Sequence, residues 1–363
     1  KEALGSPDSE KWRSSMAEEL DDLWKTGAFR QRKAPKGIVP IKTRFVFKVK
    51  RAADGSIERY KARLVAKGYV QRCGRDFFES FSPVVGFDTM RIVFAISAME
   101  RWNLKTLDFK QAYLNAKLSE ETWLELPSGE VVQACKALYG LRQSALEWYR
   151  ELKDSILEAG WESSKNDECL YTCRKNEGKI AVLVTYVDDV LLTGNDEDEI
   201  QKMVTYLLSK YEGRDLGMPE KFVAINIQAT EEGITLNQSL YAEGIVFEGM
   251  GSTDVRRVST PLDPGMDVSA KSEEEDELDI SRFPYARVLG KLMFLGGITQ
   301  PDISSSVREL SRHIASPCIR HWRALQHLLR YLAGTTNVGI LYRYGRINGS
   351  KDGPPLVGYS DAD

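Results

Sequence analysis

The chain has 363 residues, of which 42% are hydrophobic and 28% are charged, and its formal net charge at pH 7 is −3. This length exceeds the usual size of one compact core, so we expect two or three subdomains. No apolar run approaches the roughly 18 residues of a membrane-spanning helix, and no signal peptide is visible, so we expect no membrane partner.

The cysteine content and the start of the chain give two further expectations. Five scattered cysteines favour reduced thiols in an intracellular protein over a disulfide framework. Cys169 and Cys173 lack the second ligand pair of a zinc site, so we interpret them as core thiols. The chain begins at Lys1 without an initiator methionine, and we therefore expect it to be part of a longer protein.

The first half of the chain mixes amphipathic helices with strands. Periodicity and capping residues predict helices over residues 6–26, 88–98 and 144–159, and strands over residues 41–49, 57–65 and 104–109. Asp54-Gly55 predicts a hairpin turn between the first two strands. On the second of these strands Lys61 and Arg63 are two residues apart, so their side chains are expected on the same side.

The second half begins with two apolar runs in residues 180–192, separated only by Asp188-Asp189. A helix is predicted to follow over residues 196–210. Beyond residue 227 we expect helices, over residues 285–295, 302–314 and 319–332, interrupted by an acidic insert at residues 273–279 that we expect to be mobile. Helices mixed with mainly antiparallel hairpins indicate an α+β fold.

The charge is unevenly distributed despite its small total. Residues 30–72 hold fourteen Lys or Arg against two acids, and residues 282–346 hold ten against two. Acidic residues gather instead at 196–199 and 273–279. Two basic zones of this kind can form a groove for a polyanion on a weakly acidic protein. The alternative, that both zones are solvated charged faces, stays open at this point.

Three aspartates stand where strands are predicted to end. Asp188 and Asp189 are expected in a two-residue turn between apolar strands, and Asp108 lies near the end of the strand over residues 104–109. Adjacent anions repel each other, and a bound divalent cation relieves the repulsion. Carboxylates that converge without His or Cys suit Mg²⁺ better than zinc. Two such ions can catalyse phosphoryl transfer, as in polymerases, some nucleases and cyclases.

Tyr186-Val187-Asp188-Asp189 resembles the YxDD box of reverse transcriptases. Further blocks are similar to the copia-type (Pseudoviridae-like) LTR retrotransposon family: residues 61–71 (KARLVAKGYVQ), 79–85 (ESFSPVV), 107–115 (LDFKQAYLN), 137–149 (ALYGLRQSALEWY), 258–264 (VSTPLDP), 300–303 (QPDI) and 321–334 (HWRALQHLLRYLAG). A lone YxDD is weak evidence, but these blocks follow the family order from about Trp12 to the C-terminus. The resemblance is therefore specific, and it is to the reverse transcriptase part of a pol polyprotein.

The resemblance implies a right-hand polymerase with a mainly antiparallel palm sheet. We expect an N-terminal helix and fingers in residues 1–103, a palm with some fingers elements in residues 104–228, and a thumb or connection in residues 229–357. The reverse transcriptase core would cover about residues 20–262. The implied activity is RNA-directed DNA polymerisation, which extends a primer on RNA or DNA with deoxynucleoside triphosphates and two Mg²⁺ ions, with Mn²⁺ as a substitute.

The resemblance also assigns roles to individual residues. The expected catalytic and metal-binding triad is Asp108, Asp188 and Asp189. The expected nucleotide-binding residues are Lys61, Arg63, Tyr113, Gly140 and Arg142. The expected primer- and template-binding residues are Tyr186, Lys221, Arg323 and Arg330.

Tyr113, five residues after Asp108, matches the aromatic steric gate that excludes ribonucleotides; without the resemblance, a core aromatic is the simpler interpretation. Lys61 and Arg63 match the finger-strand cations that hold the triphosphate, and the guanidinium geometry suits that task. Which of the two makes the main contact stays open. Residues 221–227 (KFVAINI) take the place of the primer grip, and the helix over residues 319–332 is expected to turn its basic face to the duplex.

The chain departs from the family pattern at three places. Ala145 replaces a usual proline, Arg214 replaces the lysine of Lys-Asp-Leu-Gly, and Val223-Ala224 replace Leu-Gly before the primer-grip strand. A second hypothesis therefore stays open, namely an inactive or repurposed relic that binds nucleic acid without synthesis. The third hypothesis is a two-metal nuclease. Tyr113 and the cations expected to bind the triphosphate argue against it.

Residues 358–363 resemble the first strand of a ribonuclease H domain, in which Asp361 would be the first metal-binding carboxylate. Because the rest of that domain is absent from the sequence, we expect no ribonuclease H activity. The family resemblance further implies other polyprotein parts, such as integrase and ribonuclease H, as partners. It also implies an intracellular, cytoplasmic location in a virus-like particle.

Overall fold

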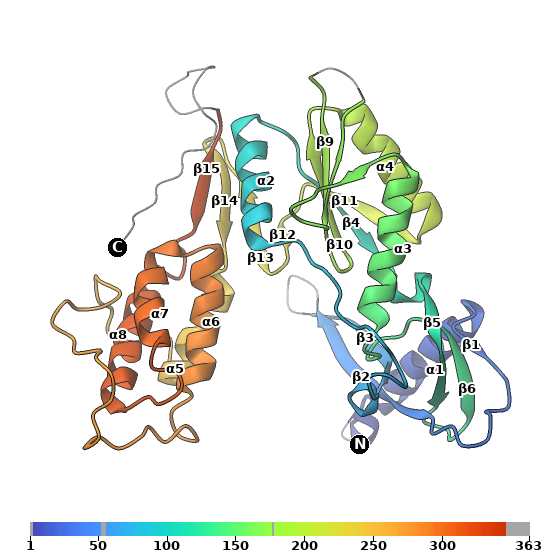
Figure 1. Ribbon diagram of the computed structural model, residues 1–363, viewed down its shortest axis with the longest axis horizontal. Helices are drawn as coiled ribbons and strands as arrows, with labels where there is room; N and C mark the ends of the chain where they lie inside the picture. Colours follow the sequence, from blue (N-terminus) through green and yellow to red (C-terminus); the bar gives the residue numbers. More distant parts are fainter. Residues whose placement is uncertain (1–2, 52–55, 176–177, 346–363) are drawn as a thin grey trace. The chain divides into compact units, whose positions relative to one another are not determined.

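The computed structural model describes residues 3–51, 56–175 and 178–345 (Figure 1). The chain forms two compact units, the first from Lys1–Val85 and Thr106–Leu216, the second from Gly86–Lys105 and Gly217–Asp363. Helices combine with mainly antiparallel sheets, so the expected α+β class is confirmed. Within the described residues, no helix has the length and apolar character needed to cross a bilayer.

The first unit contains a five-stranded sheet that helix α1 (Ser9–Lys25) packs against. Its strands, in spatial order, are β1 (Phe29–Arg30), β6 (Val131–Lys136), β5 (Lys117–Glu125), β2 (Ile41–Arg51) and β3 (Ile57–Ala66). Strands β2 and β5 are parallel, and the other neighbours are antiparallel. The predicted hairpin of β2 and β3 is confirmed, although its predicted turn at Asp54-Gly55 lies outside the described residues.

Helix α1 packs along β3, which is an edge strand of this sheet. The Ser15 hydroxyl oxygen accepts a hydrogen bond from the Ala62 amide at 2.8 Å. The Glu19 carboxylate accepts one from the Leu64 amide at 3.0 Å. Trp12 is buried beneath the same helix. The edge amides that would otherwise be unpaired are therefore satisfied by side chains of α1.

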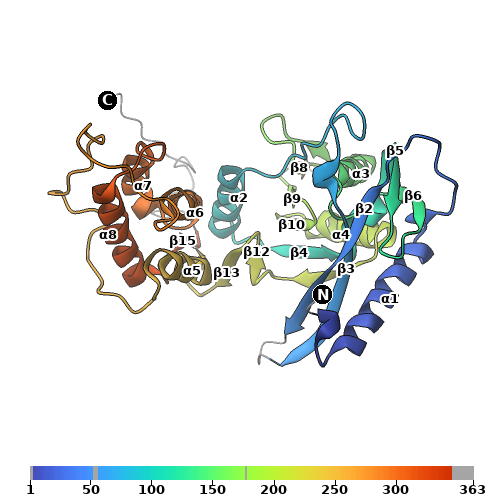
Figure 2. The same ribbon diagram turned by 90° about the horizontal axis from the view of Figure 1, so that it is seen from below.

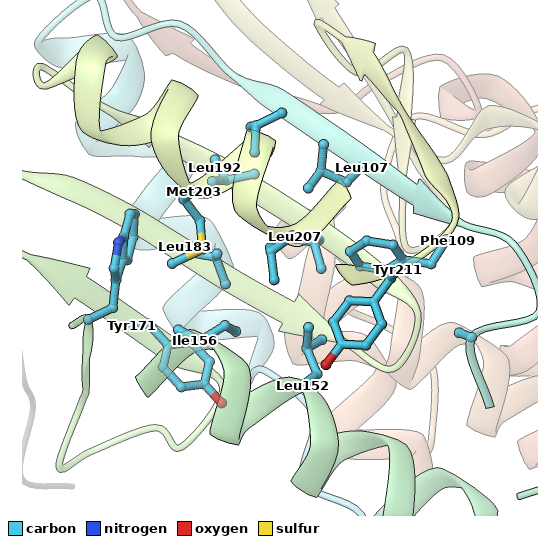
Figure 3. Packing of buried hydrophobic residues seen from close by; sticks show 14 of the residues in the cluster. Leu107, Phe109, Leu152, Ile156, Tyr171, Leu183, Leu192, Met203, Leu207 and Tyr211 are labelled. Atoms are coloured by element: carbon cyan, nitrogen blue, oxygen red, sulfur yellow. The ribbon is translucent and has the colours of Figure 1, made fainter. Parts of the chain in front are cut away.

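A six-stranded sheet forms the other half of the first unit. Its strands, in spatial order, are β11 (Gly213–Gly217), β4 (Lys105–Phe109), β10 (Asp189–Gly194), β9 (Ala181–Tyr186), β8 (Leu170–Cys173) and β7 (Glu162–Ser163). Helices α3 (Ser144–Glu158) and α4 (Glu197–Lys210) pack on it. Figure 3 shows apolar side chains of both helices meeting those of the strands, among them Leu107, Leu152, Leu183 and Leu207. This core supports the hairpin that carries Asp188 and Asp189.

Among its described residues, the second unit combines a four-stranded antiparallel sheet with α-helices. Figure 2 gives a second view of these elements. The strands are β12 (Lys221–Phe222), β13 (Ile225–Ala229), β14 (Gly233–Asn237) and β15 (Ile340–Arg343). The helices are α2 (Phe87–Met99), α5 (Ser239–Met250), α6 (Tyr285–Ile298), α7 (Ser304–Ser311) and α8 (Ile319–Thr335). One apolar cluster joins α5, α6, α7 and α8.

Two expectations for the second half of the chain were wrong. Helical structure was expected beyond residue 227, but β14 and β15 are strands that extend the sheet of β13. Each has only four or five residues, too few for a clear period-2 pattern. The acidic insert, expected to be mobile, is anchored: the Arg320 guanidinium donates to the Glu275 carboxylate at 2.8 Å, and the buried Leu278 donates its amide to the Pro317 carbonyl at 2.8 Å.

Two backbone segments of the first unit approach each other closely at Gly68 and Gly140. The Gly68 amide donates to the Gly140 carbonyl at 3.1 Å, and the Ala66 amide donates to the Tyr139 carbonyl at 2.8 Å. A Cβ atom at Gly140 would lie 2.2 Å from the Ala66 carbonyl oxygen, and Gly140 has a φ of +93°. Only glycine fits both the contact and the backbone angle.

We therefore predict that Gly140→Ala strongly lowers the free energy of unfolding, measured by chemical denaturation. The matched control is Gly27→Ala, because Gly27 also has a positive φ, +71°, but nothing within 4 Å of an added Cβ. The control should lose about 1–2 kcal/mol from the backbone angle alone. Gly140→Ala should lose about 1–3 kcal/mol more from overpacking. Equal losses in the two variants would show that the close approach is not a constraint.

Candidate active site

Asp188 and Asp189 lie at the tip of the hairpin formed by β9 and β10. Tyr186 pairs with Asp189 in the strand register, so the two turn residues are Val187 and Asp188. The expectation that both aspartates occupy the turn was wrong, because Asp189 is the first residue of β10. The apolar residues of both strands are buried on both faces of the sheet, so the hairpin is anchored in the core of the unit.

The turn is strained and is held by the core beneath it. Val187 has a φ of +57°, which is unfavourable for a β-branched side chain. The indole N–H of Trp148, on α3, donates to the Val187 carbonyl at 2.8 Å. Trp148 is completely buried, and its ring meets those of Phe109 and Tyr211 at 5.7 and 5.2 Å. The strained turn is thus supported by a hydrogen bond from Trp148, which is buried in the core of the unit.

Asp108 lies on β4, the strand next to β10. Its neighbours Leu107 and Phe109 are buried, whereas the Asp108 side chain is exposed. Desolvation by the surrounding protein and the negative charges of Asp188 and Asp108 together raise the pKa of Asp189 to about 6, although its side chain is exposed. Asp108 and Asp188 therefore lie near enough to Asp189 to act on its carboxylate electrostatically.

Arg214 of β11 contacts this carboxylate group, a contact that the sequence did not indicate. Its guanidinium lies 3.3 Å from the Asp108 carboxylate. The two side chains are 71% and 54% exposed, so this ion pair adds little to stability. It does, however, orient Asp108 toward β11.

The side chains of Asp108, Asp188 and Asp189 suit Mg²⁺ better than they suit zinc. They supply carboxylate oxygens without thiolate or imidazole, the set that Mg²⁺ prefers. The mutual repulsion that raises the pKa of Asp189 is also what a cation would relieve. In the part of the chain that is described, however, no three Asp, Glu, His or Cys side chains lie close enough to share one ion. Joint ligation therefore requires side-chain rotation, such as that of Asp108 away from Arg214.

Tyr113 lies in the short helical turn Ala112–Asn115, just after β4. It packs partly against the core, as the simpler interpretation expected. Burial and the charge of Asp188 raise its pKa to about 12, so it also lies near the carboxylates. Its ring centroid is 4.6 Å from that of Tyr139. The structure thus places Tyr113 between the core and the aspartates, and its role as a steric gate stays a prediction.

Lys61 and Arg63 share one side of β3, as predicted, because the alternate residues Ala62 and Leu64 are buried. Burial lowers the pKa of Lys61, and the charge of Arg63 lowers it further. The Arg63 guanidinium lies 4.8 Å from the centroid of the Tyr139 ring. Arg63 therefore contacts the same ring that Tyr113 contacts, and phosphate binding by Arg63 and Lys61 stays a prediction.

Gly140 and Arg142 connect the start of α3 to the end of β3. The Arg142 amide donates to the Gln71 side-chain oxygen at 2.8 Å, and its Nε donates to the Gly68 carbonyl at 3.3 Å. Gln71 in turn donates to the buried Gln143 side chain at 3.1 Å. These bonds give Gly140 and Arg142 a clear structural role, and nucleotide binding by them stays a prediction.

Tyr186 is half-buried at the end of β9, whereas Lys221, Arg323 and Arg330 belong to the second unit. Lys221 and Arg323 are exposed, and Arg330 is half-buried on α8. Their contacts with nucleic acid stay predictions. Asp361, the predicted ribonuclease H carboxylate, lies outside the described residues.

The departures Val223-Ala224 form the turn between β12 and β13. Their φ angles are +47° and +61°, a left-handed pair that favours glycine. The chain therefore carries strain at this turn that glycine would relieve at position 224.

Comparison with known proteins bears on this site. Residues 27–264 match a family model described as "Reverse transcriptase (RNA-dependent DNA polymerase)". The chain belongs to this reverse transcriptase family. The resemblance inferred from the sequence blocks is thereby confirmed.

Relatives of this reverse transcriptase chain include plant transposon proteins. It is 34% identical to the "Retrovirus-related Pol polyprotein from transposon TNT 1-94" of Nicotiana tabacum, covering 100% of this chain and 28% of the relative. It is 33% identical to the corresponding polyprotein from transposon RE1 of Arabidopsis thaliana, covering 99% and 24%. The chain thus spans only about a quarter of the length of these relatives.

A solved structure of a foamy viral protease-reverse transcriptase in complex with double-stranded DNA is similar at a TM-score of 0.47 and 14% identity. The similarity covers 89% of this chain and 48% of that one.

We predict that Asp189→Asn stabilises the protein in the absence of added metal ions. Because the folded-state pKa of Asp189 is raised above its ordinary value, the ionised carboxylate destabilises the fold above about pH 6. This cost disappears as the pH falls through about 6 toward 4, where the folded protein holds the proton. Thermal denaturation in a chelator should therefore show a higher Tm for Asp189→Asn at about pH 8, and little difference at about pH 4.

The matched control is Asp154→Asn, which removes an exposed carboxylate on α3 of the same unit. It should leave the Tm nearly unchanged at both pH values, since surface substitutions change stability by about 0.5 kcal/mol or less. A lower Tm for Asp189→Asn at high pH would contradict the electrostatic description of the site.

Proposed function

We propose that this chain is an RNA-directed DNA polymerase that extends a primer on an RNA or DNA template. The observation that carries the proposal is that Asp108 on β4 and Asp188 at the neighbouring hairpin tip act on Asp189, and Asp188 on Tyr113, in a chain of the reverse transcriptase family. Phosphoryl transfer needs little covalent chemistry from the protein. It depends on positioning and on stabilising charge.

The three aspartates would hold two Mg²⁺ ions, or Mn²⁺ in their place. Bound there, the ions would lower the pKa of the primer 3′-hydroxyl and neutralise charge on the triphosphate and the leaving pyrophosphate. The strained but supported turn at Val187 keeps Asp188 at the hairpin tip. The carboxylates therefore need no large rearrangement of the backbone to bind cations.

The cationic side of β3 would bind the triphosphate. Arg63 supplies a planar guanidinium that suits bidentate phosphate contacts, and Lys61 adds a second positive charge. Tyr113 would lie under the sugar of the incoming nucleotide. A ring in contact with C2′ leaves no room for a 2′-hydroxyl, so the enzyme would select deoxynucleotides.

The primer–template would be bound through the basic zones and through Tyr186, Lys221, Arg323 and Arg330. We further propose that the chain works inside the cell, in the cytoplasm, together with other polyprotein parts such as integrase and ribonuclease H. The fingers, palm and thumb boundaries given from the sequence belong to the same proposal.

A second candidate function is nucleic-acid binding by a relic that no longer synthesises DNA. The observation that favours it is the left-handed Val223-Ala224 turn, because Ala224 occupies a backbone conformation that suits glycine. A shift of this hairpin could misplace a primer end, and a misplacement of about 1 Å can cost about a hundredfold in rate. The primer-extension experiment below separates the two candidates.

We predict that Asp188→Asn or Asp108→Asn abolishes primer extension on poly(rA)/oligo(dT) with Mg²⁺. Each substitution removes a carboxylate charge from the proposed metal site, whereas the affinity for nucleic acid comes from the basic zones. Primer–template affinity should therefore stay nearly constant. Asp154→Asn, on the surface of α3, serves as the control for both measurements.

Two results would contradict the proposal in different ways. If Asp188→Asn keeps more than a few per cent of the activity, the assignment of the triad is wrong. If the unmodified chain binds primer–template but extends no primer with Mg²⁺ or Mn²⁺, the relic is the correct interpretation.

We also predict that Tyr113→Ala allows the incorporation of ribonucleotides. Removing the ring should lift the steric penalty on the 2′-hydroxyl, so the ratio of kcat/KM for deoxynucleotides to that for ribonucleotides should fall. Tyr113→Phe, which keeps the ring, should retain the selectivity. If Tyr113 is only a core aromatic, Tyr113→Ala should instead cost about 3–5 kcal/mol of stability and affect both substrates alike.

A further inference from the structure

Tyr139 contacts two residues of the proposed nucleotide site, Tyr113 and Arg63. Its ring centroid is 4.6 Å from that of Tyr113, with an interplanar angle of 50°. The Arg63 guanidinium carbon lies 4.8 Å from the same Tyr139 ring. Tyr139 is half-buried.

The position of Tyr139 is set by its backbone. Its carbonyl accepts a hydrogen bond from Ala66, the last residue of the strand that carries Arg63. The next residue, Gly140, is fixed by its close approach to Gly68. Tyr139 and Arg63 are therefore held by the same junction, although they are far apart in the sequence.

The electrostatics agree with this location. Burial raises the pKa of Tyr139, the positive charge of Arg63 opposes that shift, and the charges of Asp188 and Asp108 add to it. The ring thus lies within the field of both the proposed phosphate-binding cation and the proposed metal-binding carboxylates.

We propose that Tyr139 is a positioning residue that links Arg63 to Tyr113, so that triphosphate binding and sugar selection depend on the same ring. This inference rests on the proposed function. An arginine side chain has many rotamers, and a cation–π contact restricts the guanidinium to the face of the ring. The contact of the Tyr139 ring with Tyr113 in turn limits how far Tyr113 can rotate away from an added 2′-hydroxyl. Without the Tyr139 ring, the side chains of Arg63 and Tyr113 would both be free to rotate further.

Single-nucleotide incorporation on poly(rA)/oligo(dT) tests the link, with dTTP and UTP as the two substrates. Tyr139→Phe keeps the ring and should stay within about twofold of the unmodified chain in both KM and selectivity. Tyr139→Leu should raise the KM for dTTP about tenfold, with a smaller change in kcat, and should lower the dTTP/UTP selectivity about tenfold. Primer–template affinity should not change.

The matched control is Phe47→Leu, which shortens a half-buried aromatic residue on β2 of the same unit. It should leave the KM for dTTP and the selectivity unchanged. A thermal melt of each variant checks folding, and Tyr139→Met, with a long flexible side chain, replaces Tyr139→Leu if the latter does not fold. A Tyr139→Phe variant as impaired as Tyr139→Leu would show that the hydroxyl acts, and would overturn the proposal.

A double-mutant comparison gives a result that a merely structural role would not produce. If Tyr139 acts on selectivity through Tyr113, Tyr139→Leu should have little further effect on selectivity in the Tyr113→Ala background. Independent, additive effects in the two backgrounds would overturn the link.

A readout without synthesis separates this inference from the proposed function. Phenylglyoxal modifies accessible guanidinium groups, and the rate at Arg63 can be followed by mass spectrometry. This rate should rise several-fold in Tyr139→Leu and stay unchanged in Tyr139→Phe and Phe47→Leu. If the unmodified chain extends no primer, the proposed function fails, and this rate still decides whether Tyr139 positions Arg63. If the chain extends primers but Tyr139→Leu changes neither the rate nor the selectivity, only the inference fails.

Discussion

The backbone contact between Gly68 and Gly140 is the constraint on which the rest of the site depends. It joins the end of β3, with its cations, to the segment that leads into α3. Helix α3 carries Trp148, which supports the Val187 turn through a hydrogen bond. A contact between two residues without side chains thus connects the strand that carries Lys61 and Arg63 with the carboxylates, because nothing larger would let the two backbones approach this closely.

The site concentrates features that are unfavourable in isolation. Like charges lie side by side on adjacent strands, a β-branched residue adopts a left-handed conformation, and Lys61 is partly buried among other cations. A protein tolerates such strain only where the surrounding structure compensates for it. Here the compensation comes from the buried core of α3, α4 and the six-stranded sheet. Like charges that repel within the protein are also the ones that attract ligands of opposite charge.

Long amphipathic helices could be predicted from the sequence because many residues share one period. The helices predicted over residues 144–159 and 196–210 correspond closely to α3 and α4. The short strands β14 and β15 were not predicted, because their four or five residues give only a weak period-2 signal. The carboxylates could be identified from their motif. The contact of Arg63 with Tyr139 could not, because it depends on the close approach of two distant segments.

Helix α1 lies outside the segment that matches the family model, which begins at residue 27. Its Ser15 and Glu19 nevertheless pair the amides of Ala62 and Leu64 on the edge of the sheet. A protein trimmed to the matched segment would present that edge unpaired, next to apolar surface that Trp12 covers. Open edges of this kind recruit strands from other copies, and domain swapping or aggregation follows. Helix α1 therefore protects the strand that carries Lys61 and Arg63 from pairing with another copy of the chain.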